Sequence, residues 1–166
     1  DDKQIFNITE IDYLEEVTPD NLGDDFYAKV RYYAGGTYMS LSNVNVITYS
    51  KSDSNAQLWR FIRQNNGSYK IVNQKTGMLL DALDTSAGDG VNVRTRTKEF
   101  AITSGWYLYK VGGLYALRCA DTEDLMVTVE GGDAEPETNI HLGTFTGQTA
   151  QRFALESTDF YDAVKP

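Results

Sequence analysis

The chain contains three similar segments, and each ends in an aromatic residue at the same interval. Trp106 follows Trp59 by 47 residues, and Phe153 follows Trp106 by 47. Fifteen residues before each aromatic begins a matching triplet with Asn at its centre: Val44-Asn45-Val46, Val91-Asn92-Val93 and Thr138-Asn139-Ile140. A repeat of this length predicts a fold in which one supersecondary unit is stacked or closed on itself.

Each segment has the residue pattern of short β-strands. Apolar residues alternate after each marker aromatic, as in Trp59-x-Phe61 and Trp106-x-Leu108, and an apolar pair such as Leu79-Leu80 follows. Gly, Asn, Asp and Ser stand between these runs and predict turns. This pattern is typical of strands, so we expect about four short strands in each copy.

The first copy is shorter than the other two. It has only Ser42-Asn43 where the second and third copies have eight residues each, Leu83–Gly90 and Glu130–Glu137. A surface loop tolerates such a difference in length, whereas a strand does not. We therefore expect surface loops at these three positions.

Three copies of four strands exclude most repeat architectures. A propeller needs at least about four blades, and solenoids have helical or much shorter repeats. We predict an all-β fold, a β-trefoil of three ~47-residue repeats with a short N-terminal extension. The expected bounds are 1–23 for the extension, 24–158 for the trefoil (repeats about 24–65, 66–112 and 113–158) and 159–166 for a C-terminal tail. Within the extension, residues 9–16 have the pattern of a short capped helix.

Several motifs resemble the ricin-B-type β-trefoil lectins, which also occur as carbohydrate-binding modules of secreted bacterial enzymes. They are the triplets Gln57-Leu58-Trp59 and Gln151-Arg152-Phe153, the Gly-x-Tyr strands and the Leu-Leu-Asp81-Ala segment. The resemblance covers roughly residues 24–158 and implies one shallow sugar pocket in each repeat. In such a pocket an Asp accepts hydrogen bonds from two sugar hydroxyls, and an aromatic ring stacks on the apolar face of the sugar.

Most of the pocket positions differ from the family pattern. The Asp position holds Ser40, Asp81 and Thr128, and the stacking position holds Ile47, Arg94 and His141. The Asn of the family's Asn-Gln-x-Trp motif is replaced in all three copies, and its Gln remains only as Gln57 and Gln151. The candidate carbohydrate-binding residues are Asp81, Asn92, Arg94, Asn45, Gln57, Asn139 and His141.

The second repeat offers the best candidate site, because it alone keeps the carboxylate. We expect Asp81 at the mouth of a pocket, with Asn92 as a donor and the planar guanidinium of Arg94 in place of the aromatic ring. The alternative is an Asp81–Arg94 ion pair on a solvated face. For Gln57 and the three Asn residues the alternative is a structural role, with hydrogen bonds made within the protein. For His141 the alternative is an ordinary surface or packed histidine.

The charge of the chain excludes two classes of partner. The net charge is −9 and the isoelectric point is about 4.5, which argues against nucleic acid and against anionic membrane surfaces. No apolar run is long enough to span a bilayer, so membrane insertion is not expected. The chain begins with Asp, which favours a processed or excised product, and we expect an extracellular location, secreted or at the cell surface.

No catalytic or metal site is expected, and no cofactor. Cys119 stands in an apolar strand and is expected to be a small buried residue, which leaves no Cys/His pair with His141. A glycosidase needs two carboxylates across a cleft, whereas trefoils of this type have shallow pockets. The acidic run 130–137 lacks the ligand register of a known calcium loop and is expected to be solvated.

The sequence thus predicts a non-catalytic glycan-binding module, an accessory domain of a secreted bacterial protein that is tethered to a catalytic domain in a longer parent. The alternative is a protein-interaction or inhibitor-type β-trefoil with degenerate sugar pockets, which contacts its partner through loops 83–90 and 130–137. Clustered polar groups in a pocket around Asp81 favour the lectin, and a flat or blocked surface there favours the alternative.

Overall fold

Strands dominate the computed structural model, which describes residues 15–16, 22–82, 88–97 and 102–157. The strands are β1 (Glu15–Glu16), β2 (Asp25–Tyr32), β3 (Tyr38–Ser42), β4 (Asn45–Tyr49), β5 (Trp59–Arg63), β6 (Tyr69–Asn73), β7 (Leu79–Ala82), β8 (Val93–Arg96), β9 (Gly105–Val111), β10 (Leu114–Cys119), β11 (Leu125–Val129), β12 (Ile140–Thr144) and β13 (Phe153–Ser157). Strands β2 to β13 give the four strands per copy that the sequence predicts.

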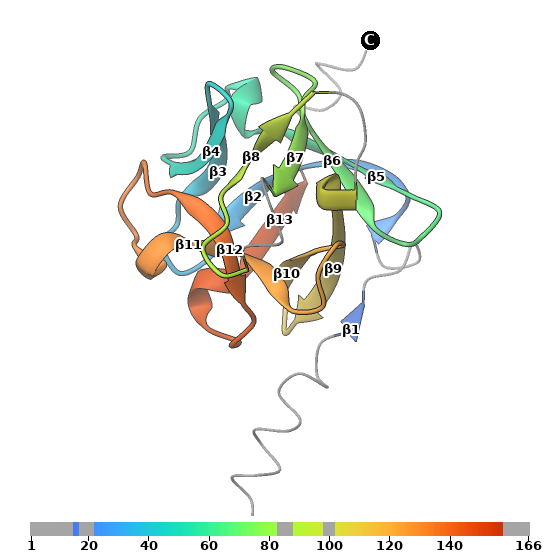
Figure 1. The fold of residues 1–166 in the computed structure, drawn as a ribbon. Helices are drawn as coiled ribbons and strands as arrows, with labels where there is room; N and C mark the ends of the chain where they lie inside the picture. Colours follow the sequence, from blue (N-terminus) through green and yellow to red (C-terminus); the bar gives the residue numbers. More distant parts are fainter. Residues whose placement is uncertain (1–14, 17–21, 83–87, 98–101, 158–166) are drawn as a thin grey trace, which may run out of the picture.

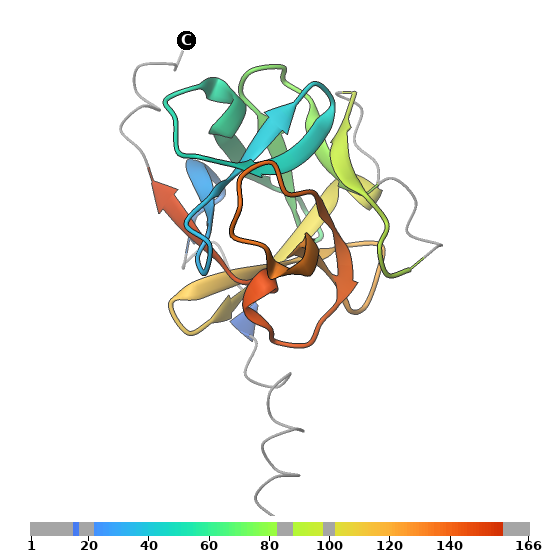
Figure 2. The same ribbon diagram turned by 90° about the vertical axis from the view of Figure 1, so that its left-hand side faces the viewer.

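Six of the strands close into a barrel (Figure 1). Strand β2 pairs with β5, β5 with β6, β6 with β9, β9 with β10, β10 with β13, and β13 again with β2. Figure 2 shows the result of closure, since the blue β2 lies beside the red β13 although they come from opposite ends of the fold. Closure leaves the barrel itself without a free edge.

The other six trefoil strands form three hairpins: β3–β4, β7–β8 and β11–β12. Each hairpin comes from one repeat, and the hairpins also pair with one another at single positions, including Asn45 with Arg94 and Asn92 with His141. A six-stranded barrel with three hairpins is a β-trefoil, so the predicted fold is confirmed.

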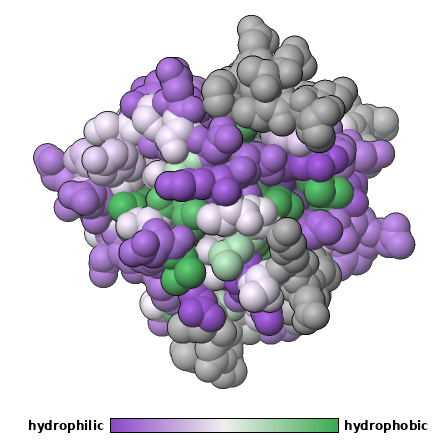
Figure 3. All heavy atoms as spheres, turned by 90° about the horizontal axis from the view of Figure 1, so that it is seen from above, coloured by the Kyte–Doolittle hydropathy of each residue, from purple (hydrophilic) through white to green (hydrophobic). Residues whose placement is uncertain are grey.

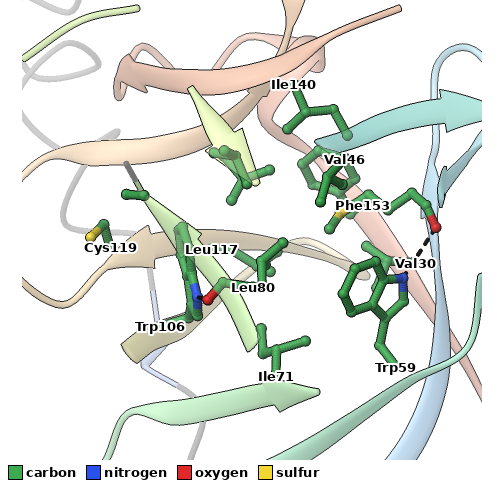
Figure 4. Close-up of a cluster of buried hydrophobic side chains, with 14 of the residues drawn as sticks. Val30, Val46, Trp59, Ile71, Leu80, Trp106, Leu117, Cys119, Ile140 and Phe153 are labelled. Atoms are coloured by element: carbon green, nitrogen blue, oxygen red, sulfur yellow. Dashed lines mark hydrogen bonds between the residues drawn. The ribbon is translucent and has the colours of Figure 1, made fainter. Parts of the chain in front are cut away.

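The three marker aromatics lie in the core. Trp59, Trp106 and Phe153 are each 0% exposed, and each is the first or second residue of a barrel strand (Figure 4). The indole of Trp59 donates to the carbonyl of Met39 at 3.1 Å, and that of Trp106 donates to the carbonyl of Leu80 at 3.0 Å. These bonds satisfy the N–H groups of two large buried side chains and fix each ring against its own hairpin.

Two expectations about local structure need correction. The helix predicted for residues 9–16 is wrong at its end, because Glu15 and Glu16 form β1 and pair with Lys110 and Tyr109 of β9; residues 9–14 lie outside the described residues. The first-repeat turn is Asn43-Val44, since Ser42 pairs with Asn45. Asn43 has φ 57°, which a two-residue hairpin turn of this kind requires.

The surface on one side of the molecule is mixed in character. Figure 3 shows this side from above the view of Figure 1, with small groups of hydrophobic residues among hydrophilic ones. In the described part of the chain, the large hydrophobic side chains that remain exposed are Tyr33, Val44 and Tyr49. No helix among the described residues is long and apolar enough to cross a membrane.

Candidate functional site

Asp81 lies on β7 and is more deeply placed than expected. Its residue is 3% exposed, so it lies at the floor of its pocket and not at the mouth. The hydroxyls of Thr103 and Ser104 donate to its Oδ1 at 2.7 Å and 3.0 Å. These two residues stand at the positions where the family motif has Asn and Gln. Their short side chains place both hydroxyls against the carboxylate. These two bonds tie the second hairpin to the start of β9.

The ion pair of this carboxylate differs from the predicted one. Arg94 faces Asp81 in the β7–β8 register, but Nη1 of Arg96 is the group that approaches Oδ1, at 3.7 Å. The predicted Asp81–Arg94 ion pair is therefore wrong, and its place is taken by a residue two positions further along the same strand. All these contacts reach Oδ1; in the described part of the chain no donor is bonded to Oδ2.

A pocket of about 360 Å³ opens around this carboxylate. Its walls combine charged, polar and apolar side chains from β7, β8 and the first-repeat turn: Val44, Met78, Asp81, Arg94, Thr95, Arg96 and Thr97. The Nε groups of Arg94 and Arg96 are buried, and neither has a hydrogen-bond partner among the described residues. Two guanidinium groups and a carboxylate therefore line one pocket, and the Arg96 side chain is 37% exposed.

The three predicted Asn residues lie together and not in three separate pockets. Asn45 Nδ2 donates to Asn139 Oδ1 at 3.0 Å, Asn139 Nδ2 to Asn92 Oδ1 at 3.0 Å, and Asn92 Nδ2 to Asn45 Oδ1 at 2.9 Å. Each amide thus gives one bond and receives one, and the bonds close a ring that we call the Asn ring. The alternative of a structural role is the one that this geometry supports for all three.

The stacking-position residues lie next to the Asn ring. Arg94 pairs with Asn45, His141 with Asn92, and Ile47 with Asn139, so each repeat meets the next in the same way. Nδ1 of His141 lies 2.9 Å from the carbonyl of Leu142, as in an ordinary packed histidine. Nearby, hydrogen bonds from Thr144 hold the pKa of Asp89 below its usual value, with a smaller contribution from His141.

Gln57 and Gln151 bond to the backbone. Gln57 is 1% exposed, donates to the carbonyl of Ser50 at 2.7 Å and accepts from the amide of Ser52 at 2.9 Å. Gln151 is 0% exposed and makes the matching bonds to Thr144 and Thr146. Both side chains fix the loop before their marker aromatic, and the nitrogen and oxygen of Gln57 are both engaged by backbone bonds.

A second pocket, in the first repeat, contains residues that the sequence reasoning missed. Its volume is about 330 Å³, and its lining includes Ser40, Ile47, Tyr49 and Glu137. Tyr49 is 45% exposed and lies two residues after Ile47. Side chains two apart on a strand share one face, so this spacing already indicates an aromatic ring beside the stacking position. Glu137 comes from the third repeat, has φ 65° and donates its amide to Thr48 at 2.6 Å. Only the fold brings this carboxylate to the pocket.

Cys119 is buried, as predicted. It is 0% exposed, and its Sγ lies 4.0 Å from the carbonyl of Thr103. Burial raises the pKa of the Cys119 thiol from 9.0 to about 11, which favours the protonated thiol. A group in this state does not suit a nucleophile. Among the described residues, no three His, Cys, Asp or Glu side chains converge as metal ligands.

Comparison with known proteins agrees with this architecture. Residues 18–96 match the family described as ricin-type β-trefoil lectin domain-like. The designed threefold-symmetric protein ThreeFoil is similar with a TM-score of 0.76 and 27% identity, over 80% of this chain and 99% of that one. A ricin B-like lectin of Macrolepiota procera, solved with lactose, has a TM-score of 0.71 and 17% identity, over 80% of this chain and 95% of that one.

Part of an enzyme is also similar. An exo-β-1,3-galactanase from Clostridium thermocellum has a TM-score of 0.75 and 23% identity over 86% of this chain but only 31% of its own length. A comparison with curated protein sequences found no match. The repeated Gln-x-aromatic motifs and the closed barrel with three hairpins agree with the family match over residues 18–96, and together they support a ricin-B-type β-trefoil lectin fold.

Proposed function

We propose that this chain is a non-catalytic glycan-binding module whose main site is the pocket around Asp81. The observation that carries the proposal is the group of charged side chains gathered there. Asp81, Arg94 and Arg96 line one pocket, and in the described part of the chain no donor is bonded to Oδ2 of Asp81. A sugar offers paired hydroxyls, which can donate to the carboxylate and accept from the guanidinium groups.

The geometry gives each residue a role. Thr103, Ser104 and Arg96 occupy Oδ1 and hold the carboxylate in one orientation, so that Oδ2 is the acceptor for a sugar hydroxyl. The planar guanidinium of Arg94 covers the sugar where other members of the family use an aromatic ring. A shallow pocket of this kind buries little of a sugar, so we expect affinities of roughly millimolar to micromolar.

The wider role that we propose is that of an accessory domain in a secreted bacterial protein, tethered to a catalytic partner. The similarity to about a third of a galactanase supports this arrangement, because there the trefoil accompanies a longer chain. Tethering raises the effective concentration of a weak binder at its polymer and so offsets low affinity per site. The open polar pocket at Asp81 favours this role over an interaction trefoil with blocked pockets.

The test is a glycan array followed by calorimetry on the wild type, Asp81→Asn and the charge-matched control Asp53→Asn. Asn keeps an oxygen for Thr103 and Ser104, whereas Ala would leave both buried hydroxyls without their acceptor at a cost of about 1–3 kcal/mol. Asp53 does not line the pocket, and its side chain is 99% exposed. We expect Asp81→Asn to weaken binding roughly ten- to hundredfold, a loss of about 1.5–3 kcal/mol, and Asp53→Asn to leave it unchanged.

Two results would overturn the proposal in different ways. Equal affinities of wild type and Asp81→Asn would exclude the second-repeat pocket as the main site and direct attention to the pocket of Tyr49 and Glu137. If the wild type bound no glycan at all, glycan binding itself would be refuted, and the protein-interaction trefoil would replace it.

A further inference from the structure

A third pocket lies in the third repeat, away from the positions where the family binds sugars. Its volume is about 290 Å³, and we call it the third-repeat cleft. Its lining combines two aromatic rings, a guanidinium group and two carboxylates: Tyr109, Arg118, Glu123, Asp124, Met126, Thr144 and Phe145. It shares no lining residue with the pockets of Asp81 or Tyr49.

Arg118 is held in place by contacts that leave its charge unpaired. Its guanidinium lies over the rings of Tyr107 and Tyr109, at 4.6 Å and 5.6 Å from their centroids. Its Nε donates to the hydroxyl of Tyr109 at 3.1 Å, and its Nη1 donates to the carbonyl of Thr122. Arg118 forms no ion pair with a described residue, although Glu123 and Asp124 line the same cleft. The donor group is therefore oriented before any ligand arrives.

The same place in the second repeat has no aromatic ring. The register of the barrel pairs equates Tyr109 with Ile62 and Arg118 with Val72, because each stands at the same offset from its marker aromatic and strand partner. The corresponding hollow is lined by Ile62, Val72 and Leu79 together with Arg60, Lys70, Asn73, Gln74 and Gly77, and the guanidinium of Arg60 is paired with Asp25. It has no aromatic platform, and its guanidinium is already engaged by a carboxylate.

In the first repeat the corresponding groups are bonded to each other. Arg31 and Glu156 occupy the positions of Arg118 and Tyr109. Nη1 of Arg31 lies 4.0 Å from Oε2 of Glu156, and the hydroxyl of Tyr38 donates to Oε1 of Glu156 at 2.8 Å. The third repeat therefore differs from both others, since it alone has an aromatic cleft whose guanidinium and carboxylates are not paired together.

We infer that the third-repeat cleft is a second saccharide subsite, which takes one neutral pyranose ring; this inference rests on the proposed glycan-binding function. The rings of Tyr109 and Phe145 suit the C–H face of the sugar, the carboxylates of Glu123 and Asp124 accept from its hydroxyls, and Arg118 donates to a ring or hydroxyl oxygen. Two carboxylates against one guanidinium disfavour an anionic ligand. The volume is at the lower end for ligand pockets, which fits a single ring.

The test is two-dimensional amide NMR of the full chain, titrated with galactose, glucose, mannose and N-acetylglucosamine. We expect at least one of these sugars to shift the amides of residues 123–126 and 144–145, and to do so equally in Asp81→Asn, because the two sites share no residue. Phe145→Ala should raise the dissociation constant obtained from these shifts by up to about tenfold, since a stacked ring is lost. Tyr33→Ala, which removes an aromatic ring that is 57% exposed elsewhere, should leave them unchanged.

The possible outcomes separate this inference from the proposed function. Shifts confined to the Asp81 pocket would overturn the subsite and leave the main site standing. Shifts at the cleft that persist in Asp81→Asn support the subsite, even where the Asp81 pocket itself gives none. Loss of the cleft shifts in Asp81→Asn, or no shift with any of the four sugars, would overturn the subsite.

Discussion

At the pseudo-threefold axis all three repeats present the same residue, and in the pockets around it they present different ones. Asn45, Asn92 and Asn139 form one ring in which each side chain bonds to the next. Two residues further along each strand stand an isoleucine, an arginine and a histidine, and the Asp position holds a carboxylate in one repeat only.

The difference follows from what each position contacts. A change at one member of the Asn ring removes a donor from one neighbour and an acceptor from the other, so all three copies are constrained together. A change in a pocket affects the few side chains that line that pocket and the solvent, and it leaves the pockets of the other repeats unaltered. The second-repeat pocket thus holds the carboxylate of Asp81, the first holds Tyr49 and Glu137, and the third repeat has its separate aromatic cleft.

The largest effect should come from the core. We expect Trp106→Ala to lower the free energy of unfolding by about 3–5 kcal/mol, because it removes a fully buried ring and its bond to Leu80. Tyr49→Ala, at a pocket position, should change it by less than about 0.5 kcal/mol. Urea denaturation of both variants measures the contrast, and comparable losses would show that the pockets are as constrained as the core.

A smaller loss should follow from breaking the Asn ring. We expect Asn92→Ala to cost about 1–3 kcal/mol, since it leaves Asn45 and Asn139 each with an unmade bond. Asn139→Ala should cost a similar amount by symmetry. In the double variant the second substitution should cost less than it does alone, because the ring is already open. Strict additivity in urea denaturation would mean that the three amides act independently.

The smallest effect concerns Cys119 and pH. Its pKa is raised by burial from 9.0 to about 11, so the folded state holds the thiol proton more tightly than the unfolded state does. This contribution to stability is complete below pH 9 and is lost as the pH rises from 9 towards 11. The stability of the wild type relative to Cys119→Ala should therefore fall across this window, while tyrosines common to both proteins cancel. A constant difference, or rapid labelling of Cys119 by a thiol reagent at pH 7, would contradict this burial.

The fold could be predicted from the sequence because its signals are local and repeated. Alternating apolar residues, turn residues and a constant interval between aromatics require no knowledge of distant contacts, and they also predicted the burial of Cys119. The expected helix failed at Glu15 and Glu16, where pairing with β9 outweighs local helical preference.

The site was less predictable because its geometry depends on contacts between repeats. The interval of the Asn residues was visible, but their meeting at one axis requires the closed barrel. The choice of Arg96 over Arg94 for Asp81 depends on side-chain reach across a hairpin, and Thr103 and Ser104 gained their role only where β9 passes the hairpin. Glu137 reaches the first-repeat pocket through a loop that the sequence places in another repeat.

The pairing that closes the barrel also has a consequence in time. Phe153 pairs with Tyr32, which lies 121 residues earlier in the chain. A ribosome adding about 5–20 residues per second needs roughly 6–24 s to make the segment between them. During that interval the edge of β2 that β13 will cover has no partner, and an uncovered strand edge is a template for another chain. The last strand of this trefoil is therefore also its protection against misassembly, and it is the last to arrive.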